Sequence, residues 1–328
     1  MQYSTLGRSG LRVSSLTLGT MNFGASAGVT VCDRKEADRI VGTFLDAGHN
    51  VVDTADKYNH GEAEEIVGAT LKGRRNEVVL ATKGGQPQGA GPNDQGLSRA
   101  HLTQALEASL RRLSTDHIDL YQCHLPDPDT PHEETMAVLD GFVRSGKVRY
   151  VGCSNYSAAQ LVEAQWAAER VGAVPFVSHQ TQYSLAAREA EQEVLPTGSR
   201  HGMGTLAWSP LGAGVLVGRY PRGTGAHEAA PDSRLGRVTA QSERLGRFWA
   251  RSLLTEHKLD IADVVAAVAA ELGVSSAAVA VSWVLRRDYV TSVVIGPRTV
   301  DHLTAILSAY ELDLPAETLA RLEKVSRF

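Results

Sequence analysis

The stretch "VVDTADKYNHGEAEEIVG" (residues 51–68) joins a short apolar run, which ends in Asp53, to an amphipathic run that starts near Gly61. The first run has the length and β-branched content of a buried strand, and the second has the spacing of a helix. Tyr58 lies between them. The stretch therefore predicts a strand–loop–helix unit with a carboxylate at the end of the strand and a phenol in the loop.

The same unit recurs along the chain. Each apolar run is brief, β-branched and bounded by turn residues, which is typical of buried parallel strands. Each helical pattern begins after a residue that caps helix N-termini well. The expected strands are 15–19, 50–54, 77–83, 117–124, 148–155, 175–180, 204–210 and 291–296. The expected helices are 34–48 after Asp33, 98–112 from Ser98, 157–171 from Ser157, 299–309 from Thr299, and two within 260–287 that meet near Gly273.

Eight strands alternating with helices predict an α/β fold, a (β/α)8 TIM barrel formed as a single domain by residues 1–328. A doubly wound open sheet is the alternative. Residues 3–19 have a strand–turn–strand pattern around Gly7 and Gly10, which predicts an N-terminal β-hairpin that closes the bottom of the barrel. Residues 211–258 are rich in Gly, Arg and Pro and too long for a simple connection, so we expect a long functional loop there.

Composition narrows the class of protein. The chain has 328 residues, of which 43% are hydrophobic and 21% charged, and a net charge of -4, which argues against nucleic acid as the main partner and gives no reason to expect an anionic membrane. Three cysteines fit no disulfide or zinc pattern and favour a reducing, cytoplasmic location. The N-terminus does not resemble a secretory signal, and no apolar run is long enough to span a membrane.

Catalytic side chains of barrels lie at the carboxyl ends of strands. Asp53, Lys83 and His124 occupy three such ends, and Tyr58 follows the first of them. A phenol is a weak acid with a pKa of about 10, which a nearby ammonium group lowers. A carboxylate offsets the cost of burying that ammonium group, and an imidazole orients a substrate oxygen. Alone, Asp53, Tyr58 and His124 are more often a cap, a packing residue and a satisfied polar residue, whereas a lysine seldom ends a buried strand without a partner. The convergence of all four predicts proton donation to a carbonyl oxygen.

Several motifs, in order, resemble those of the aldo-keto reductases. They are "VVDTADKY", "ATK", "YQCHLPDPDTP", "GKVRYVGCSNYS", "SHQTQYS", "LAWSPLGAGVLVGRY" and "VIGPRT", and the resemblance runs from about Leu6 to Leu322. It implies a (β/α)8 barrel that reduces carbonyl compounds with a nicotinamide cofactor and without a metal. It also implies that Asp53, Tyr58, Lys83 and His124 form the catalytic tetrad.

The resemblance further implies a binding site for NADP. Ser154, Asn155 and Gln180 match positions that bind the nicotinamide carboxamide, and Trp208 matches the aromatic residue that stacks on its ring. The remaining matches surround the phosphates or the mouth of the site: Thr20, Met21, Ser209, Leu211, Gly214, Arg219, Arg234, Gly296 and Arg298. Where the family commonly has Gln, an acidic residue and Asn against the adenine, this chain has His302, Ala305 and Ile306, so we expect a weaker polar contact there.

Three other patterns are incomplete. "GAGVLVG" (212–218) has its last glycine one residue late for a dinucleotide fingerprint, and "GGQPQGAGPNDQG" (84–96) lacks the Lys-Ser/Thr ending of a phosphate loop. Cys123, His124 and Cys153 are weak as a metal set because cysteine is commonly a small buried apolar residue. We therefore expect no metal, and we expect specificity to reside in the loops 22–33, 84–97, 125–131 and 211–258.

The sequence thus predicts an NADPH-dependent reductase of a small aldehyde or ketone. Sugars and nucleotide keto-sugars are candidate substrates, because "SHQTQYSLAAREAEQEVLP" and "NDQGLSRAHL" resemble reductases of nucleotide-sugar pathways. An aldose dehydrogenase is one alternative. Another is an NADPH-binding regulatory module like the potassium-channel β subunits, against which His124 and the lack of a long N-terminal extension argue. The sequence does not predict an oligomeric state.

Overall fold

The computed structural model describes residues 3–26 and 29–327. Within them, eight parallel strands close into a barrel in the order β10-β11-β12-β3-β6-β7-β8-β9. The predicted (β/α)8 barrel is confirmed, and the open doubly wound sheet is wrong. The strands are β3 (Leu16–Gly19), β6 (Val51–Asp53), β7 (Val79–Gly84), β8 (Ile118–Cys123), β9 (Val148–Ser154), β10 (Ser178–Gln182), β11 (Gly204–Trp208) and β12 (Ser292–Ile295).

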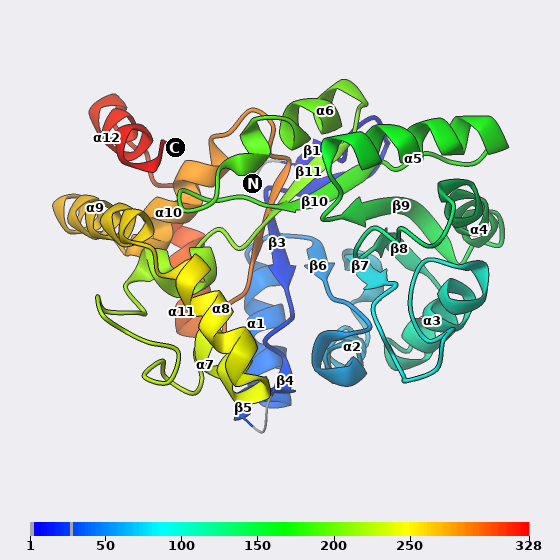
Figure 1. Cartoon of the computed structure of the whole chain (residues 1–328), viewed down its shortest axis with the longest axis horizontal. Coiled ribbons are helices and arrows are strands. Elements are labelled where there is room, and N and C mark those ends of the chain that lie inside the picture. Colours follow the sequence, from blue (N-terminus) through cyan, green and yellow to red (C-terminus); the bar gives the residue numbers. More distant parts are fainter. Residues whose placement is uncertain (1–2, 27–28, 328) are drawn as a thin grey trace.

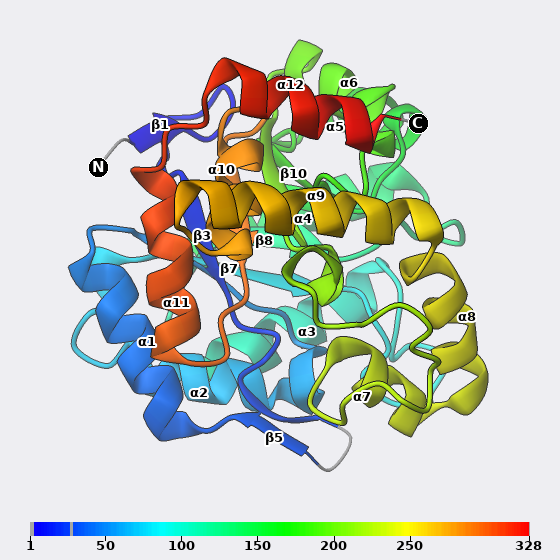
Figure 2. The same ribbon diagram turned by 90° about the vertical axis from the view of Figure 1, so that its left-hand side faces the viewer.

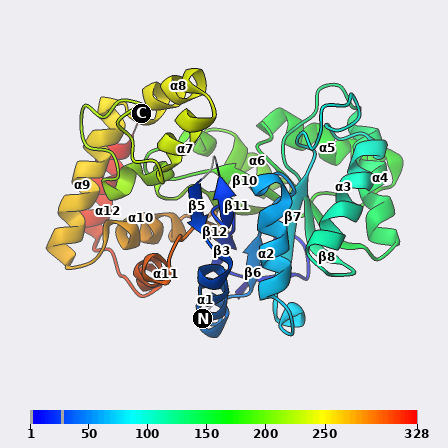
Figure 3. The same cartoon turned by 90° about the horizontal axis from the view of Figure 1, so that it is seen from below.

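Helices surround the strands on all sides (Figure 3). Their buried faces and the outward-facing strand residues form one large apolar core between the two layers. The helices around the barrel are α1 (Arg34–Asp46), α2 (Glu62–Thr70), α3 (Arg99–Arg112), α4 (His132–Arg144), α5 (Ala158–Val171), α6 (Val194–Arg200), α9 (Glu256–Leu272), α10 (Ser276–Leu285), α11 (Val300–Leu307) and α12 (Ala316–Ser326). The predicted N-caps Asp33, Ser98, Ser157 and Thr299 each accept a backbone N–H, and Gly273 ends α9 as predicted.

The N-terminal hairpin is also confirmed. β1 (Tyr3–Thr5) pairs antiparallel with β2 (Arg12–Ser14). Leu6 and Val13 join the apolar cluster inside the barrel, so the hairpin covers the amino-terminal ends of the strands. The turn lies so close to the barrel that a Cβ on Gly7, whose φ is +59°, would lie 2.4 Å from the carbonyl oxygens of Val177 and Gly202.

The long connection between β11 and α9 is not the irregular loop that we expected. It contains the turn η4 (Gly212–Val217) and two short helices, α7 (Arg234–Gln241) and α8 (Glu243–Leu253). With the small hairpin β4 (Gly24–Ser26) and β5 (Val29–Cys32), α7 and α8 lie at the end of the molecule opposite to β1 (Figure 1). The carboxyl ends of the barrel strands therefore open toward these elements. Residues 27 and 28 of the predicted specificity loop 22–33 lie outside the described residues.

The C-terminal helix α12 packs alongside α9 on the outside of the barrel (Figure 2). In the described part of the chain, no single helix is long and apolar enough to cross a membrane. Only α9 and α10 taken together pass such a test, and they are bent by 102°.

Candidate active site

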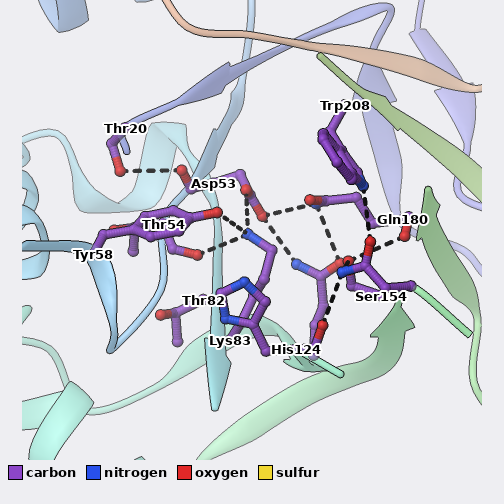
Figure 4. A network of polar contacts seen from close by, with 12 residues as sticks. Thr20, Asp53, Thr54, Tyr58, Thr82, Lys83, His124, Ser154, Gln180 and Trp208 are labelled. Carbon is purple, nitrogen blue, oxygen red and sulfur yellow. Dashed lines mark hydrogen bonds and ion pairs between the residues drawn. The ribbon is translucent and has the colours of Figure 1, made fainter. Parts of the chain in front are cut away.

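Asp53 and Lys83 form a buried ion pair inside the barrel. Both are 1% exposed, and Lys83 Nζ donates to Asp53 Oδ2 at 2.5 Å (Figure 4). The same ammonium group donates to the Thr54 carbonyl at 3.0 Å and to the Tyr58 hydroxyl at 3.3 Å. The parallel register that sets Asp53 beside Ala81 brings the ends of β6 and β7 together. Lys83 thus bridges the carboxylate and the phenol, as the sequence predicted.

Two amide side chains also donate hydrogen bonds to Asp53. Its Oδ1 accepts from Gln122 Nε2 at 2.9 Å and from Gln180 Nε2 at 3.1 Å. Gln180 was predicted as a cofactor residue, whereas Gln122 was not predicted. The period of two in β8 could have found it, because Leu120 faces the barrel interior and Gln122 shares its face. The carboxylate is therefore held by an ammonium group and two neutral donors.

Tyr58 is presented by a strained turn, η1 (Tyr58–Gly61), in front of α2. Asn59 and His60 have positive φ angles of 48° and 56°, a region that non-glycine residues seldom occupy. The Asn59 amide donates to the Phe23 carbonyl at 2.5 Å, which fixes the turn to the segment after β3. Strain of this kind persists only where the surroundings hold it, and it clusters at functional sites.

Burial is the largest influence on the pKa of both Tyr58 and Lys83. It raises the pKa of Tyr58 above the ordinary value, and the positive charge of Lys83 lowers it by a smaller amount. The lysine therefore acts in the expected direction, but the net shift is upward. Burial lowers the pKa of Lys83, whereas the Asp53 carboxylate raises it, and the net direction is upward. At neutral pH Lys83 is therefore an ammonium ion and Tyr58 a protonated phenol.

His124 follows β8 and faces the phenol. The two rings meet edge to face, with centroids 5.7 Å apart. Its backbone N–H donates to the Gly84 carbonyl at 2.9 Å, and Nδ1 has no hydrogen-bond partner among the described residues. Burial, followed by the charge of Lys83, lowers the pKa of His124 to about 3. The imidazole is therefore neutral and has one N–H to offer a substrate oxygen near the Tyr58 hydroxyl.

The residues predicted to hold the nicotinamide form a continuous chain of contacts across β9, β10 and β11 (Figure 4). Ser154 Oγ donates to the Gln180 carbonyl at 3.0 Å, and Asn155 Nδ2 donates to Ser154 Oγ at 3.0 Å. Trp208 Nε1 donates to Asn155 Oδ1 at 3.2 Å, which sets the plane of the indole. On the opposite side, Thr20 Oγ1 donates to the Asp53 carbonyl at 3.1 Å, with Met21 next to it.

A cluster of arginines lies beside this chain of contacts. Asp232 bridges Arg219 and Arg298, with Arg298 Nη1 at 2.6 Å from Asp232 Oδ2. Arg234 and Arg237, in α7, have no carboxylate partner in the described residues. Arg237 is 4% exposed, its Nη2 donates to Asn22 Oδ1 at 3.0 Å, and its Nε and Nη1 have no partner there. Two of these four guanidinium groups thus share one carboxylate, and the other two have none among the described residues.

Such a cluster fits the phosphates of a dinucleotide, because buried positive charge without a counterion calls for an anion. Burial, then the neighbouring Arg234 and Arg298, lowers the pKa of Arg237 to about 10. Arg237 was not predicted, since no local sequence pattern shows that a helical arginine is buried. Asn22, whose Nδ2 donates to the Gly296 carbonyl at 2.9 Å, connects Arg237 to the end of β12.

The other residues predicted to surround the cofactor belong to the turn after β11 and to α11. Ser209 has a φ of 59°, and its Oγ accepts from the Ala213 N–H at 3.0 Å, so Leu211 and Gly214 belong to one tight turn. His302 is in the first turn of α11, where burial and then Arg298 lower its pKa. Ile306 is 3% exposed in the apolar core and provides no polar group.

The predicted specificity loops are joined to one another. Asp127 Oδ2 accepts from the Leu97 N–H at 2.7 Å and from Thr130 Oγ1 at 2.6 Å, so it ties the loop 84–97 to the loop 125–131. The loop 84–97 is also closed on itself by the bond from the Gly96 N–H to the Gly85 carbonyl at 2.9 Å. In the described residues, no group of three or more His, Cys, Asp or Glu side chains is placed to hold a metal ion.

Fold and site together define a (β/α)8-barrel enzyme whose polar centre lies at the carboxyl ends of the strands. The model of the Aldo/keto reductase family matches residues 15–327, and the chain belongs to that family. The resemblance inferred from the motifs is confirmed. Members of the family are oxidoreductases that reduce carbonyl groups and generally use nicotinamide cofactors.

Three relatives are similar over almost the whole chain. An uncharacterised oxidoreductase, YrpG, of Bacillus subtilis (strain 168) is 41% identical over 336 residues, covering 99% of this chain and 96% of that protein. A probable voltage-gated potassium channel subunit beta of Oryza sativa subsp. japonica is 38% identical, covering 99% and 95%. A versiconal hemiacetal acetate reductase of Aspergillus parasiticus is 33% identical, covering 99% and 96%.

Proposed function

We propose that this protein is an NADPH-dependent reductase of aldehydes or ketones in which Tyr58 is the general acid. The observation that carries the proposal is the contact of Lys83 Nζ with both Asp53 Oδ2 and the Tyr58 hydroxyl. The phenol is protonated at neutral pH and has an ammonium neighbour that stabilises the phenolate left after proton transfer.

The roles of the other groups follow from their contacts. When bound, the reduced nicotinamide supplies a hydride to the carbonyl carbon. Neutral His124 donates a hydrogen bond to the carbonyl oxygen and holds it near the Tyr58 hydroxyl. Gln180, Ser154 and Asn155 would hold the carboxamide, with the ring against Trp208. Asp53 keeps the ammonium group of Lys83 in place.

We infer that NADP is the preferred cofactor because the arginine cluster offers more positive charge than a pyrophosphate needs. Arg234 and Arg237 suit the pyrophosphate, and Arg298, at the start of α11, suits a 2′-phosphate. We also infer that the chain acts as a single domain, 1–328, and that it works in the cytoplasm. The three cysteines are free and buried, which agrees with a reducing compartment.

A substrate panel tests the proposal. Purified protein is mixed with NADPH and with simple aldehydes, ketones, free sugars and nucleotide keto-sugars, and loss of the reduced-nicotinamide absorbance is followed. We expect turnover with at least one carbonyl class. Faster reaction of aldoses with NADP in the opposite direction would instead support an aldose dehydrogenase.

The similarity to the rice potassium-channel β subunit, 38% identical, supports a second candidate, an NADPH-binding regulatory module with little turnover. The two candidates differ in one observable. A module of that kind binds NADPH tightly and leaves it unoxidised with every carbonyl in the panel, whereas a reductase oxidises it within one turnover.

A further inference from the structure

A second polar cluster lies on the outer side of the barrel wall, behind Lys83. Thr82 precedes Lys83 in β7, and because side chains alternate along a strand it points the opposite way, toward Glu64 of α2. Its Oγ1 donates to Glu64 Oε1 at 2.5 Å, and Arg112 Nε donates to Glu64 Oε2 at 2.7 Å. Glu64 is fully buried. The single guanidinium group of this cluster is thus already paired with one carboxylate.

Asp56 adds a second carboxyl group with no cation of its own. It is 0% exposed, and neither side-chain oxygen has a hydrogen-bond partner among the described residues. The groups that face it are Glu64 from α2, Arg112 from α3, Tyr121 from β8 and Lys57 from its own loop. An ionised carboxylate in such a place is costly, so the acid stays neutral. Burial, then the charge of Glu64, raises the pKa of Asp56 to about 8.

Asp56 also belongs to the segment that presents Tyr58. Its backbone N–H donates to the Lys83 carbonyl at 3.1 Å, and the Tyr58 N–H donates to the Ala55 carbonyl at 3.1 Å. Arg112 runs directly beneath the end of η1, since a Cβ on Gly61 would lie 2.7 Å from Arg112 Cδ. The strained turn is therefore supported from outside the barrel by the cluster that contains Asp56.

We propose that Asp56 is a positioning residue that, as a neutral carboxylic acid, keeps the Tyr58 turn closed, and that loss of its proton loosens the turn and lowers turnover in alkaline solution. Ionised Asp56 places a second negative charge beside Glu64, and the two carboxylates repel each other. Opening of the strained turn lets water reach both of them. The inference rests on the proposed function, in which Tyr58 is the acid. Ionisation of Tyr58 itself is a separate event at higher pH, because its pKa is raised from 10.0.

The first test is the pH dependence of kcat and KM for the wild type, Asp56→Asn and Asp46→Asn. Asp46 is the matched control, because its side chain is 71% exposed and pairs only with Arg74 at the surface. We expect the wild type and the control to lose kcat with a midpoint near pH 8 and with little change in KM. In Asp56→Asn the amide cannot ionise, so the alkaline limb should move up by at least about one pH unit. An unmoved limb in Asp56→Asn overturns the proposal.

The second test needs no substrate or cofactor, so it separates this inference from the proposed function. Infrared difference spectra between pH 6.5 and 9.5 report protonated carboxyl groups directly. We expect the wild type and Asp46→Asn to lose a protonated-carboxyl band over this interval and Asp56→Asn to show none. A wild type without that band at pH 6.5 refutes the role of Asp56 even if carbonyl reduction is established. A wild type with the band and no turnover keeps the neutral acid and rejects the function instead.

Discussion

Lys83 is the residue on which the site depends, since it is a fully buried cation that contacts the phenol. Removing one partner of a buried ion pair leaves an uncompensated charge and costs roughly 3–5 kcal/mol. Asp53→Ala leaves the buried ammonium ion of Lys83 without its carboxylate partner. We therefore expect a loss of that size in the free energy of unfolding and a loss of activity. In Lys83→Met the carboxylate takes up a proton and keeps Gln122 and Gln180, so kcat should fall much more than stability.

Chemical denaturation and kcat measured on the same preparations check this prediction. Lys147→Met is the control, because Lys147 is 43% exposed and pairs with Glu107 at the surface. Exposed pairs contribute about 0–1 kcal/mol, so the control should retain both stability and activity. If both site variants unfold like the wild type and remain active, the pair is neither buried nor required.

The choice of cofactor also belongs to single residues. A charged hydrogen bond is worth about 1.5–3 kcal/mol, which corresponds to a preference for NADPH over NADH of roughly ten- to a hundredfold. Because Asp232 already engages Arg298, a 2′-phosphate must compete for it, and we expect a value near the lower limit. Arg298→Ala should weaken NADPH binding by that factor and leave NADH binding nearly unchanged.

Titrations of both cofactors, read by tryptophan fluorescence, measure these dissociation constants. Arg247→Ala is the control, because Arg247 in α8 is 57% exposed and pairs with Glu243 of the same helix. Equal dissociation constants for NADPH and NADH in the wild type would refute the assignment of Arg298.

At the scale of the elements, the attachment of α12 to the barrel depends on one acidic side chain, Glu323. Glu323 Oε2 accepts from Arg188 Nη1 at 2.7 Å, and Oε1 accepts from Trp283 Nε1 at 3.1 Å. Glu323→Ala removes the acceptor of Trp283 Nε1, whereas Arg188 Nη1 keeps its bond to Ser326 Oγ at 2.8 Å. We therefore expect a loss of about 1–3 kcal/mol in stability, faster hydrogen exchange in α12 and no change in kcat. Glu271→Ala, which breaks the exposed pair with Arg321, should change stability by less than about 1 kcal/mol. Unaltered exchange in α12 of Glu323→Ala would show that apolar packing alone holds the helix.

The sequence predicted those elements best whose apolar runs and capping residues are clearest. Apolar runs and capping residues located all eight barrel strands and the N-cap Ser157, because burial and capping act on neighbouring residues. The expected strand 175–180 forms only from Ser178, since Pro175 has no N–H to pair. The helices α7 and α8 were missed because Gly, Arg and Pro around them obscure short amphipathic patterns.

Side chains whose role depends on tertiary contacts were harder to predict. Asp53, Tyr58, Lys83 and His124 were found because strand ends converge in a barrel, and the structure brings all four together. Arg237 and Asp56 were not found, because nothing within a few residues of either shows that it is buried with polar atoms left unpaired among the described residues. The roles proposed for the four catalytic residues, for Arg237 and for Asp56 stay predictions until variants are measured.

At the scale of the whole molecule, buried histidines set the dependence of stability on pH. Burial lowers the pKa of His49 and His179 to about 4 and that of His124 to about 3. These groups charge more readily in the unfolded chain, so the stability they contribute is complete above pH 6.5 and is lost as pH falls toward 4. The contribution of Asp56 to this pH dependence has the opposite sign. Because its pKa is raised, Asp56 stabilises the fold at low pH, and that contribution is lost as pH rises toward 8.

Near pH 5.5 the three histidines and Asp56 give a net uptake of about two protons on unfolding, which is three minus one. These four groups therefore contribute a rise of about 2.7 kcal/mol per pH unit to the free energy of unfolding around this value, and His101 and His302, whose pKa values are also lowered, add to it. Denaturation curves at pH 5, 5.5 and 6 measure the slope, and His179→Asn should reduce it by one proton. A slope of zero in the wild type would mean that these histidines are not buried in neutral form.

The central claim, that Tyr58 donates the proton in carbonyl reduction, is tested most directly by a single-turnover experiment. NADPH bound to the wild type or to Tyr58→Phe is mixed with a carbonyl substrate, and its oxidation is followed by absorbance. General acid catalysis is worth about 10²–10⁴-fold, so Tyr58→Phe should oxidise bound NADPH at least about a hundredfold more slowly while binding it within about twofold of wild type. A variant that retains half of the wild-type rate would contradict the assignment.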